Sequence, residues 1–118
     1  MTDAKIRLRF YNRAAWRAWL QTNHAQPDAV WVVINKKATP PPGLTYEAAV
    51  EEALCFGWID STLNKVDDRV YGLRFSPRRP NSVWSQSNKD RVARLLRDGL
   101  MAPAGLAQVE NAKANGQW

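Results

Sequence analysis

The first part of the chain alternates between two hydrophobic patterns. In residues 12–22, two tryptophans and a leucine recur at intervals of three and four positions, which predicts the apolar face of a helix that Asn12 can cap. Residues 27–37 then contain an unbroken run of β-branched and aromatic side chains, as in a central strand. The consecutive prolines in residues 38–43 can sustain neither element, so we expect an exposed loop there.

A second helix is predicted over residues 46–56, between a capping Thr45 and a terminating Gly57. Its apolar spacing separates an inward stripe from a group of acids that should face water. The expected stripe is Tyr46, Val50, Ala53 and Leu54, and the expected solvent-facing acids are Glu47, Glu51 and Glu52.

Residues 58–76 have the pattern of two strands joined by a charged turn at 65–69, whose aspartates suit a turn. The apolar positions of the second strand do not alternate cleanly, and Gly72 is therefore expected to mark a bulge.

Two further helices follow. One is predicted over residues 86–98, with Ser85 or Ser87 as its cap and Gly99 as its end. The next starts at Pro103, since proline suits a first helical turn. The expected inward side chains of the earlier helix are Val92, Leu95 and Leu96.

The order of these elements is helix, strand, helix, two strands and two helices, which favours an α+β fold. We expect residues 1–118 to form a single domain, in which a small, mainly antiparallel sheet of about three strands has helices packed on one side.

The composition of the chain limits the kinds of partner, metal and cofactor that we expect it to bind. The net charge of +6 fits an anionic partner, such as nucleic acid, a phosphate metabolite or an anionic lipid surface. The start of the chain has no long apolar run, so we expect no signal peptide, no membrane insertion and a cytoplasmic location. Cys55 is the single cysteine, and no metal-ligand spacing or cofactor motif is recognisable, so we expect no metal and no cofactor.

Residues 74–89, RFSPRRPNSVWSQSNK, concentrate cations, hydroxyl groups and an aromatic side chain just before a predicted helix. A helix N-terminus attracts anions, and the planar forks of Arg78 and Arg79 suit a phosphate or a carboxylate. Three interpretations stay open: a folded anion pocket, a nucleic-acid surface, or an ordinary loop in which Ser85 is a cap and Trp84 fills the core.

A nucleic-acid surface would use arginines that recur every three positions on the helix after this stretch. The same spacing also fits the solvated face of an amphipathic helix. From residue 74 to residue 97, Asp90 is the one acid, against Arg74, Arg78, Arg79, Lys89, Arg91, Arg94 and Arg97.

Asp60 lies near the start of a predicted strand, with Trp58 expected on the same face and Ser61 on the other. A buried aspartate needs a partner, and Arg74 on the neighbouring strand is an obvious candidate. A general base or ligand acceptor, and simple exposure to solvent, are the other interpretations of Asp60.

Three stretches together resemble the YdeI/OmpD-associated family of bacterial proteins: LTYEAAVEEALCFGWIDS, RFSPRRPNSVWSQSNKDRV and GLMAPAGLAQVENAKANGQW. The resemblance implies a link to bacteriocin protection, antimicrobial-peptide stress or an outer-membrane porin, with no established reaction. Many members continue into a further helical segment, which we expect this chain to lack. The matching motif positions are Trp58, Asp60, Ser61, Arg74, Phe75, Pro77, Arg78, Arg79, Ser82, Trp84, Ser85 and Asn88.

The first hypothesis is a ligand-binding or stress-related accessory domain with an anion pocket. The alternatives are a nucleic-acid-binding protein and an enzyme in which Asp60 is the acid or base. The partners considered are a small anionic ligand, nucleic acid and a second copy of the chain. The candidate ligand-binding residues are Trp58, Asp60, Ser61, Arg74, Arg78, Arg79, Ser82, Trp84, Ser85 and Asn88.

Overall fold

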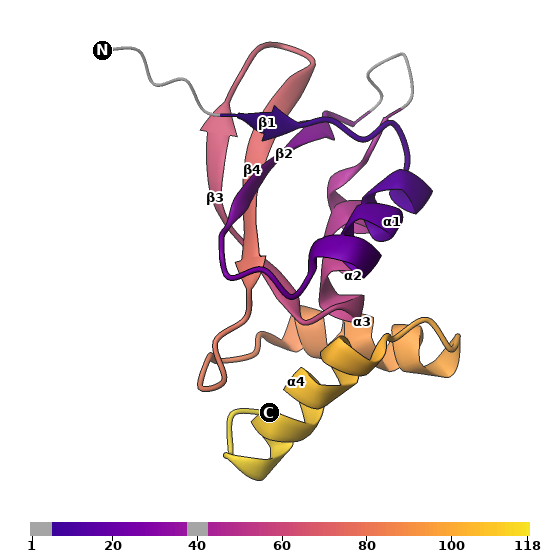
Figure 1. The fold of residues 1–118 in the computed structure, drawn as a ribbon, viewed down its shortest axis with the longest axis vertical. Helices are drawn as coiled ribbons and strands as arrows, with labels where there is room; N and C mark the ends of the chain where they lie inside the picture. The colour runs from indigo at the N-terminus through magenta and orange to yellow at the C-terminus, as the bar shows by residue number, and fades with distance from the viewer. Residues whose placement is uncertain (1–5, 38–42) are drawn as a thin grey trace.

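The computed structural model describes residues 6–37 and 43–118, so most of the expected proline loop lies outside the described residues. The described residues form an α+β fold with four helices and one sheet (Figure 1). In chain order the elements are β1 (Arg7–Leu8), α1 (Arg13–Asn23), β2 (Val30–Asn35), α2 (Tyr46–Cys55), β3 (Trp58–Lys65), β4 (Val70–Pro77), α3 (Gln86–Arg97) and α4 (Pro103–Ala114).

In the described part of the chain the sheet has four strands, in the order β1-β2-β4-β3, one more than the three expected. β1 runs parallel to β2, and the other neighbours are antiparallel. β1 has only two residues, too few for a period-two pattern to be recognised in the sequence.

Helices α1 and α2 cover one face of the sheet, while α3 and α4 lie at one end of it and pack against α2 (Figure 1). The core between α1 and the sheet is aromatic: the rings of Trp16 and Phe75 lie 5.2 Å apart, and those of Trp16 and Trp19 stack at 5.5 Å. The prediction of helices on one side therefore holds for α1 and α2, whereas α3 and α4 extend the core beyond the strands.

The predicted helix caps are confirmed. The side chains of Asn12, Thr45 and Ser85 accept hydrogen bonds from backbone N–H groups three residues further on. Gly57 ends α2 with φ +77°, a conformation that other residues rarely adopt.

Three details of the predicted helix faces are wrong. Tyr46 and Leu96, expected inward, are 41% and 43% exposed, and Glu52, expected in water, is 4% exposed. Tyr46 opens α2 and reaches toward the sheet, where its hydroxyl meets Asp60. Leu96 is exposed because α3 packs mainly on α2 and buries a narrower face through Val92.

Gly72 is not a bulge, because it pairs in register with Val33 and with Asn64. The irregularity in the sheet lies instead on β3, between Asp60 and Leu63. Gly72 has a different reason to lack a side chain, since a Cβ there would lie 3.3 Å from Nε of Arg7.

Candidate functional site

The register of the β3–β4 pair separates Asp60 from Arg74. Asp60 is paired with Phe75, and Arg74 therefore points to the opposite face of the sheet. Nη1 of Arg74 donates to Oγ of Ser61 at 3.5 Å, and that hydroxyl donates to the Arg74 carbonyl at 3.4 Å. The expected ion pair between Asp60 and Arg74 is thus wrong, and Ser61 and Arg74 lie away from the helix-covered face.

Arg78 follows β4 directly and is buried, with 3% of its surface exposed. Its backbone N–H donates to the Gly57 carbonyl at 2.8 Å, which fixes the chain where α2 ends. On the side chain, Nη1 donates to Oγ of Ser82 at 2.8 Å and to the carbonyl of Val83 at 3.4 Å. The guanidinium carbon lies 3.7 Å from the ring centroid of Trp84, within the range of a cation–π contact.

The other edge of this guanidinium, formed by Nε and Nη2 of Arg78, is buried and has no hydrogen-bond acceptor among the described residues. Burial lowers the pKa of Arg78 to about 10, and the negative charge of Asp60 partly offsets that effect. At neutral pH the side chain is therefore a buried cation, and its fork of two parallel N–H bonds meets no acceptor in the described part of the chain.

Aromatic rings line the surroundings of Arg78. Trp84 is buried, and its ring centroid lies 5.0 Å from that of Trp118. The ammonium groups of Lys89 and Lys113 lie 5.9 Å and 5.4 Å from the Trp118 centroid. Trp118 was not among the candidate residues, because nothing in its sequence spacing connects it with Trp84.

Loop 79–83 crosses this region between β4 and the start of α3. Side-chain amides of Asn111 on α4 and of Asn115, which follows the helix as its C-cap, donate to the Pro80 carbonyl at 2.8 and 2.9 Å, and Nε2 of Gln108 on α4 donates to the carbonyl of Arg78 at 3.3 Å. Arg79, in contrast, is exposed. Helix α4 thus holds the loop from one side, and Arg79 does not converge with Arg78.

The two polar candidates at the start of α3 have structural partners. Oγ of Ser85 caps the helix by accepting from the Asn88 backbone N–H at 3.2 Å. Asn88 is nearly buried, and its Oδ1 accepts from Nη1 of Arg91 at 2.8 Å.

Trp58, on β3, is also buried, and its indole N–H donates to the His24 carbonyl at 2.9 Å.

Asp60 is half-buried, and its Oδ2 accepts from the Tyr46 hydroxyl at 3.4 Å. Burial, together with the charge of Asp60, raises the pKa of the Tyr46 phenol. Tyr46 also lines a largely apolar cavity of about 450 Å³ that it shares with Tyr71 and Lys36. The negative charge of Asp60 therefore acts on two groups, the guanidinium of Arg78 and the phenol of Tyr46.

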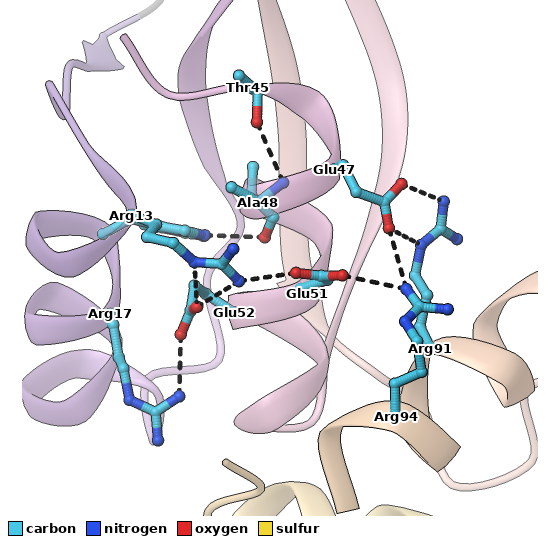
Figure 2. A network of polar contacts seen from close by, with 11 residues as sticks. Arg13, Arg17, Thr45, Glu47, Ala48, Glu51, Glu52, Arg91 and Arg94 are labelled. Atoms are coloured by element: carbon cyan, nitrogen blue, oxygen red, sulfur yellow. Dashed lines mark hydrogen bonds and ion pairs between the residues drawn. The ribbon is translucent and has the colours of Figure 1, made fainter. Parts of the chain in front are cut away.

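The acids of α2 account for several of the basic residues (Figure 2). Glu47 accepts two hydrogen bonds from Arg91, at 2.7 and 2.9 Å, which lower the pKa of the Glu47 carboxyl. Glu51 pairs with Arg94 at 3.1 Å, and Arg97 pairs with Asp98 at 3.3 Å. The arginine stripe of α3 is thus matched by carboxylates.

The opposite side of α2 carries a second part of this network (Figure 2). Glu52 accepts from Nε of Arg13 at 2.8 Å and from Nη1 of Arg17 at 2.9 Å. Glu51 also accepts from Arg13, at 2.7 Å. These arginines of α1 explain why a carboxylate can be buried at position 52.

Within residues 6–37 and 43–118, no group of three or more His, Cys, Asp or Glu side chains is placed to hold a metal ion. Burial raises the pKa of the Cys55 thiol, as expected for a structural cysteine. In the described part of the chain no helix has the length and apolar character needed to cross a membrane.

The comparisons with known proteins identify a family and no function. The model of DUF8412, described as a domain of unknown function, matches residues 8–108. No curated protein matches the chain, and no solved structure does.

Proposed function

Because the chain belongs to the DUF8412 family, whose function is unknown, we propose a function from its own geometry: the protein binds a small anionic ligand through the side chain of Arg78. One observation carries this proposal, namely that Nε and Nη2 of a 3% exposed arginine lack hydrogen-bond partners among the described residues. A buried charge without full hydrogen bonding is costly, so such a group is uncommon unless it has a use.

The buried edge of Arg78 has the chemistry of an anion site. Its two N–H bonds are parallel and match the two oxygens of a carboxylate or a phosphate. Because Nη1 is held by Ser82 and the guanidinium lies over Trp84, the fork has a fixed direction before any ligand arrives. This fixed geometry lowers the entropy cost of binding.

Ligand entry requires a local opening, since both free nitrogens are buried. Loop 79–83 is the segment suited to this movement, because Val83 is 77% exposed and Arg79 is exposed as well. The hydrogen bonds from Asn111 and Asn115 to Pro80 would restore the closed position.

The proposal does not use the arginine stripe of α3, whose charges are already matched by Glu47, Glu51 and Asp98. A catalytic role for Asp60 stays a prediction. So does the stress-related role implied by the resemblance to the YdeI/OmpD-associated family.

The test is thermal unfolding with sodium acetate, benzoate or phosphate, each compared with sodium chloride at the same ionic strength. We expect at least one of these anions to raise the midpoint of wild type and of Arg79→Met, because a ligand that binds only the folded state stabilises it. The same anion should leave Arg78→Met unchanged. An equal rise in Arg78→Met, or no rise beyond that of chloride in wild type, would refute an anion site at Arg78.

A further inference from the structure

We propose that the ligand is a monocarboxylate carried on an apolar, aromatic body; this inference rests on the proposed anion site at Arg78. The charges around Arg78 limit the charge that a ligand can carry. Arg78 is one buried cation, and Asp60 already supplies a negative charge that acts on it. Arg91, on which the charge of Asp60 also acts, is engaged by both carboxylate oxygens of Glu47 and adds no free positive charge. A singly charged ligand fits this balance, whereas a dianion brings an excess of buried negative charge.

The number of hydrogen-bond donors that Nε and Nη2 of Arg78 provide also favours a carboxylate. Nε and Nη2 of Arg78 offer two N–H bonds, and a carboxylate has two oxygens to receive them. A phosphate placed on the same fork has further charged oxygens that need donors. The nearest helix cap, Ser85, already accepts from the Asn88 N–H, and Nη1 of Arg78 is taken by Ser82. Unpaired oxygens in a buried site are costly, so the fork discriminates against phosphate.

The aromatic side chains at Arg78 limit how a ligand can approach and which groups it can pack against. Trp84 covers one face of the guanidinium with Cζ 3.7 Å from its ring centroid, so an anion must approach along the edge of Arg78, in its plane. Trp84 and Trp118, with ring centroids 5.0 Å apart, form an aromatic pair whose first member contacts Arg78. Aromatic side chains gain most from burying another flat apolar group, which favours an aryl body over a bare carboxylate.

The experiment compares four probes by isothermal titration calorimetry at pH 8: acetate, benzoate, inorganic phosphate and phenyl phosphate. Benzoate and phenyl phosphate share a body and differ in the anion, while acetate and benzoate share an anion and differ in the body. We expect benzoate to bind about ten-fold more tightly than phenyl phosphate and about ten-fold more tightly than acetate. Arg78→Lys keeps the charge but loses the parallel fork, and should weaken benzoate binding about ten-fold; Arg79→Lys is the matched control and should bind as wild type does.

The possible outcomes distinguish a wrong ligand class from a wrong anion site. Phenyl phosphate binding as tightly as benzoate, in a way that Arg78→Lys abolishes, would overturn the carboxylate class and leave the anion site in place. Acetate binding as tightly as benzoate would overturn the aromatic body. If no probe binds in a manner that depends on Arg78, the anion site itself is wrong. The wild-type ranking of the four probes decides the ligand class even if Arg78→Lys fails to fold.

Discussion

The guanidinium of Arg78 lies over the indole of Trp84, with Cζ 3.7 Å from the ring centroid. This contact joins the end of β4 to the start of α3, and it fixes the plane in which the free edge of Arg78 lies. The pair therefore has a part in packing and also determines the direction from which an anion can bind. The two roles predict different effects of mutation.

Arg78→Met should cost little stability. The substitution loses the hydrogen bonds to Ser82 and Val83, but it also removes a buried charge with two N–H bonds that lack a partner within residues 6–37 and 43–118. We expect the free energy of unfolding in urea at pH 7 to stay within about 1 kcal/mol of wild type. Trp84→Ala, which removes the packing, should lower it by about 3–5 kcal/mol. A loss of more than about 2 kcal/mol in Arg78→Met would show that Arg78 is mainly a structural residue.

The difference in unfolding free energy between wild type and Arg78→Met should depend on pH, and the lowered pKa of Arg78 determines the direction of the change. Burial lowers the pKa of Arg78 to about 10, below the ordinary value for an arginine, so the folded state binds this proton less tightly than the unfolded chain does. The destabilisation is fully present below about pH 10 and is relieved as pH rises through the folded pKa. Urea unfolding at pH 9 and pH 11 should therefore show the difference between the two proteins shifting in favour of wild type. A constant difference would contradict the lowered pKa.

Glu52→Gln should be strongly destabilising. The Glu52 side chain is 6% exposed and receives hydrogen bonds from Arg13 and Arg17, so glutamine at this position removes the buried carboxylate charge that both arginines share, although Arg13 keeps its bond to Glu51. We expect a loss of about 3 kcal/mol in the free energy of unfolding. Glu47→Gln is the matched control, because the Glu47 side chain is 51% exposed; its loss should be about 0.2–1 kcal/mol. Equal losses in the two variants would contradict the assigned burial.

Glu47 should contribute folding stability that is lost as the pH falls. Its hydrogen bonds with Arg91 lower the pKa of the carboxyl from its ordinary 4.5, so the stabilisation is present above about pH 4.5 and is lost as pH falls through the folded value. The free energy gap between wild type and Glu47→Gln should therefore narrow between pH 7 and pH 3, with Glu110→Gln, at an exposed position of α4, as the control. A gap that widens on acidification would reverse the expected sign.

Gly105→Ala should destabilise the contact between α4 and α2. A Cβ at Gly105 would overlap the backbone carbonyl of Cys55, so the helices would have to move apart. The expected loss is about 1–3 kcal/mol, although glycine to alanine in an open helix stabilises by roughly 0.5–1 kcal/mol. Ala107→Gly, exposed on the same helix, should lose about 1 kcal/mol through propensity alone. A gain of stability in Gly105→Ala would show that the two helices are not in close contact.

Local signals were enough to predict most of the elements. Asn12, Thr45 and Ser85 act as caps through hydrogen bonds that span only three residues, and Gly57 ends a helix through its own backbone conformation. Such features depend on neighbours in sequence. This explains why the helices and the longer strands agree with the patterns of the chain.

Features that depend on distant residues were not predictable in the same way. The burial of Glu52 depends on Arg13, which lies on another helix, and the separation of Asp60 from Arg74 depends on the register of β3 with β4. Arg78 and Trp84, both expected in the pocket, do lie in contact, whereas Arg79 is exposed, and the anion site itself stays a prediction.

The ¹⁵N resonance of the Arg78 Nε–H group, followed while sodium benzoate is added to the wild-type protein, tests the anion site most directly. Nε is buried and lacks a hydrogen-bond partner among the described residues, so a bound carboxylate must change its resonance. We predict a saturable shift and slower hydrogen exchange at Arg78, with the resonance of Arg79 unchanged. An Arg78 resonance that stays unmoved up to 50 mM benzoate, or that moves no more than that of Arg79, would contradict the anion site.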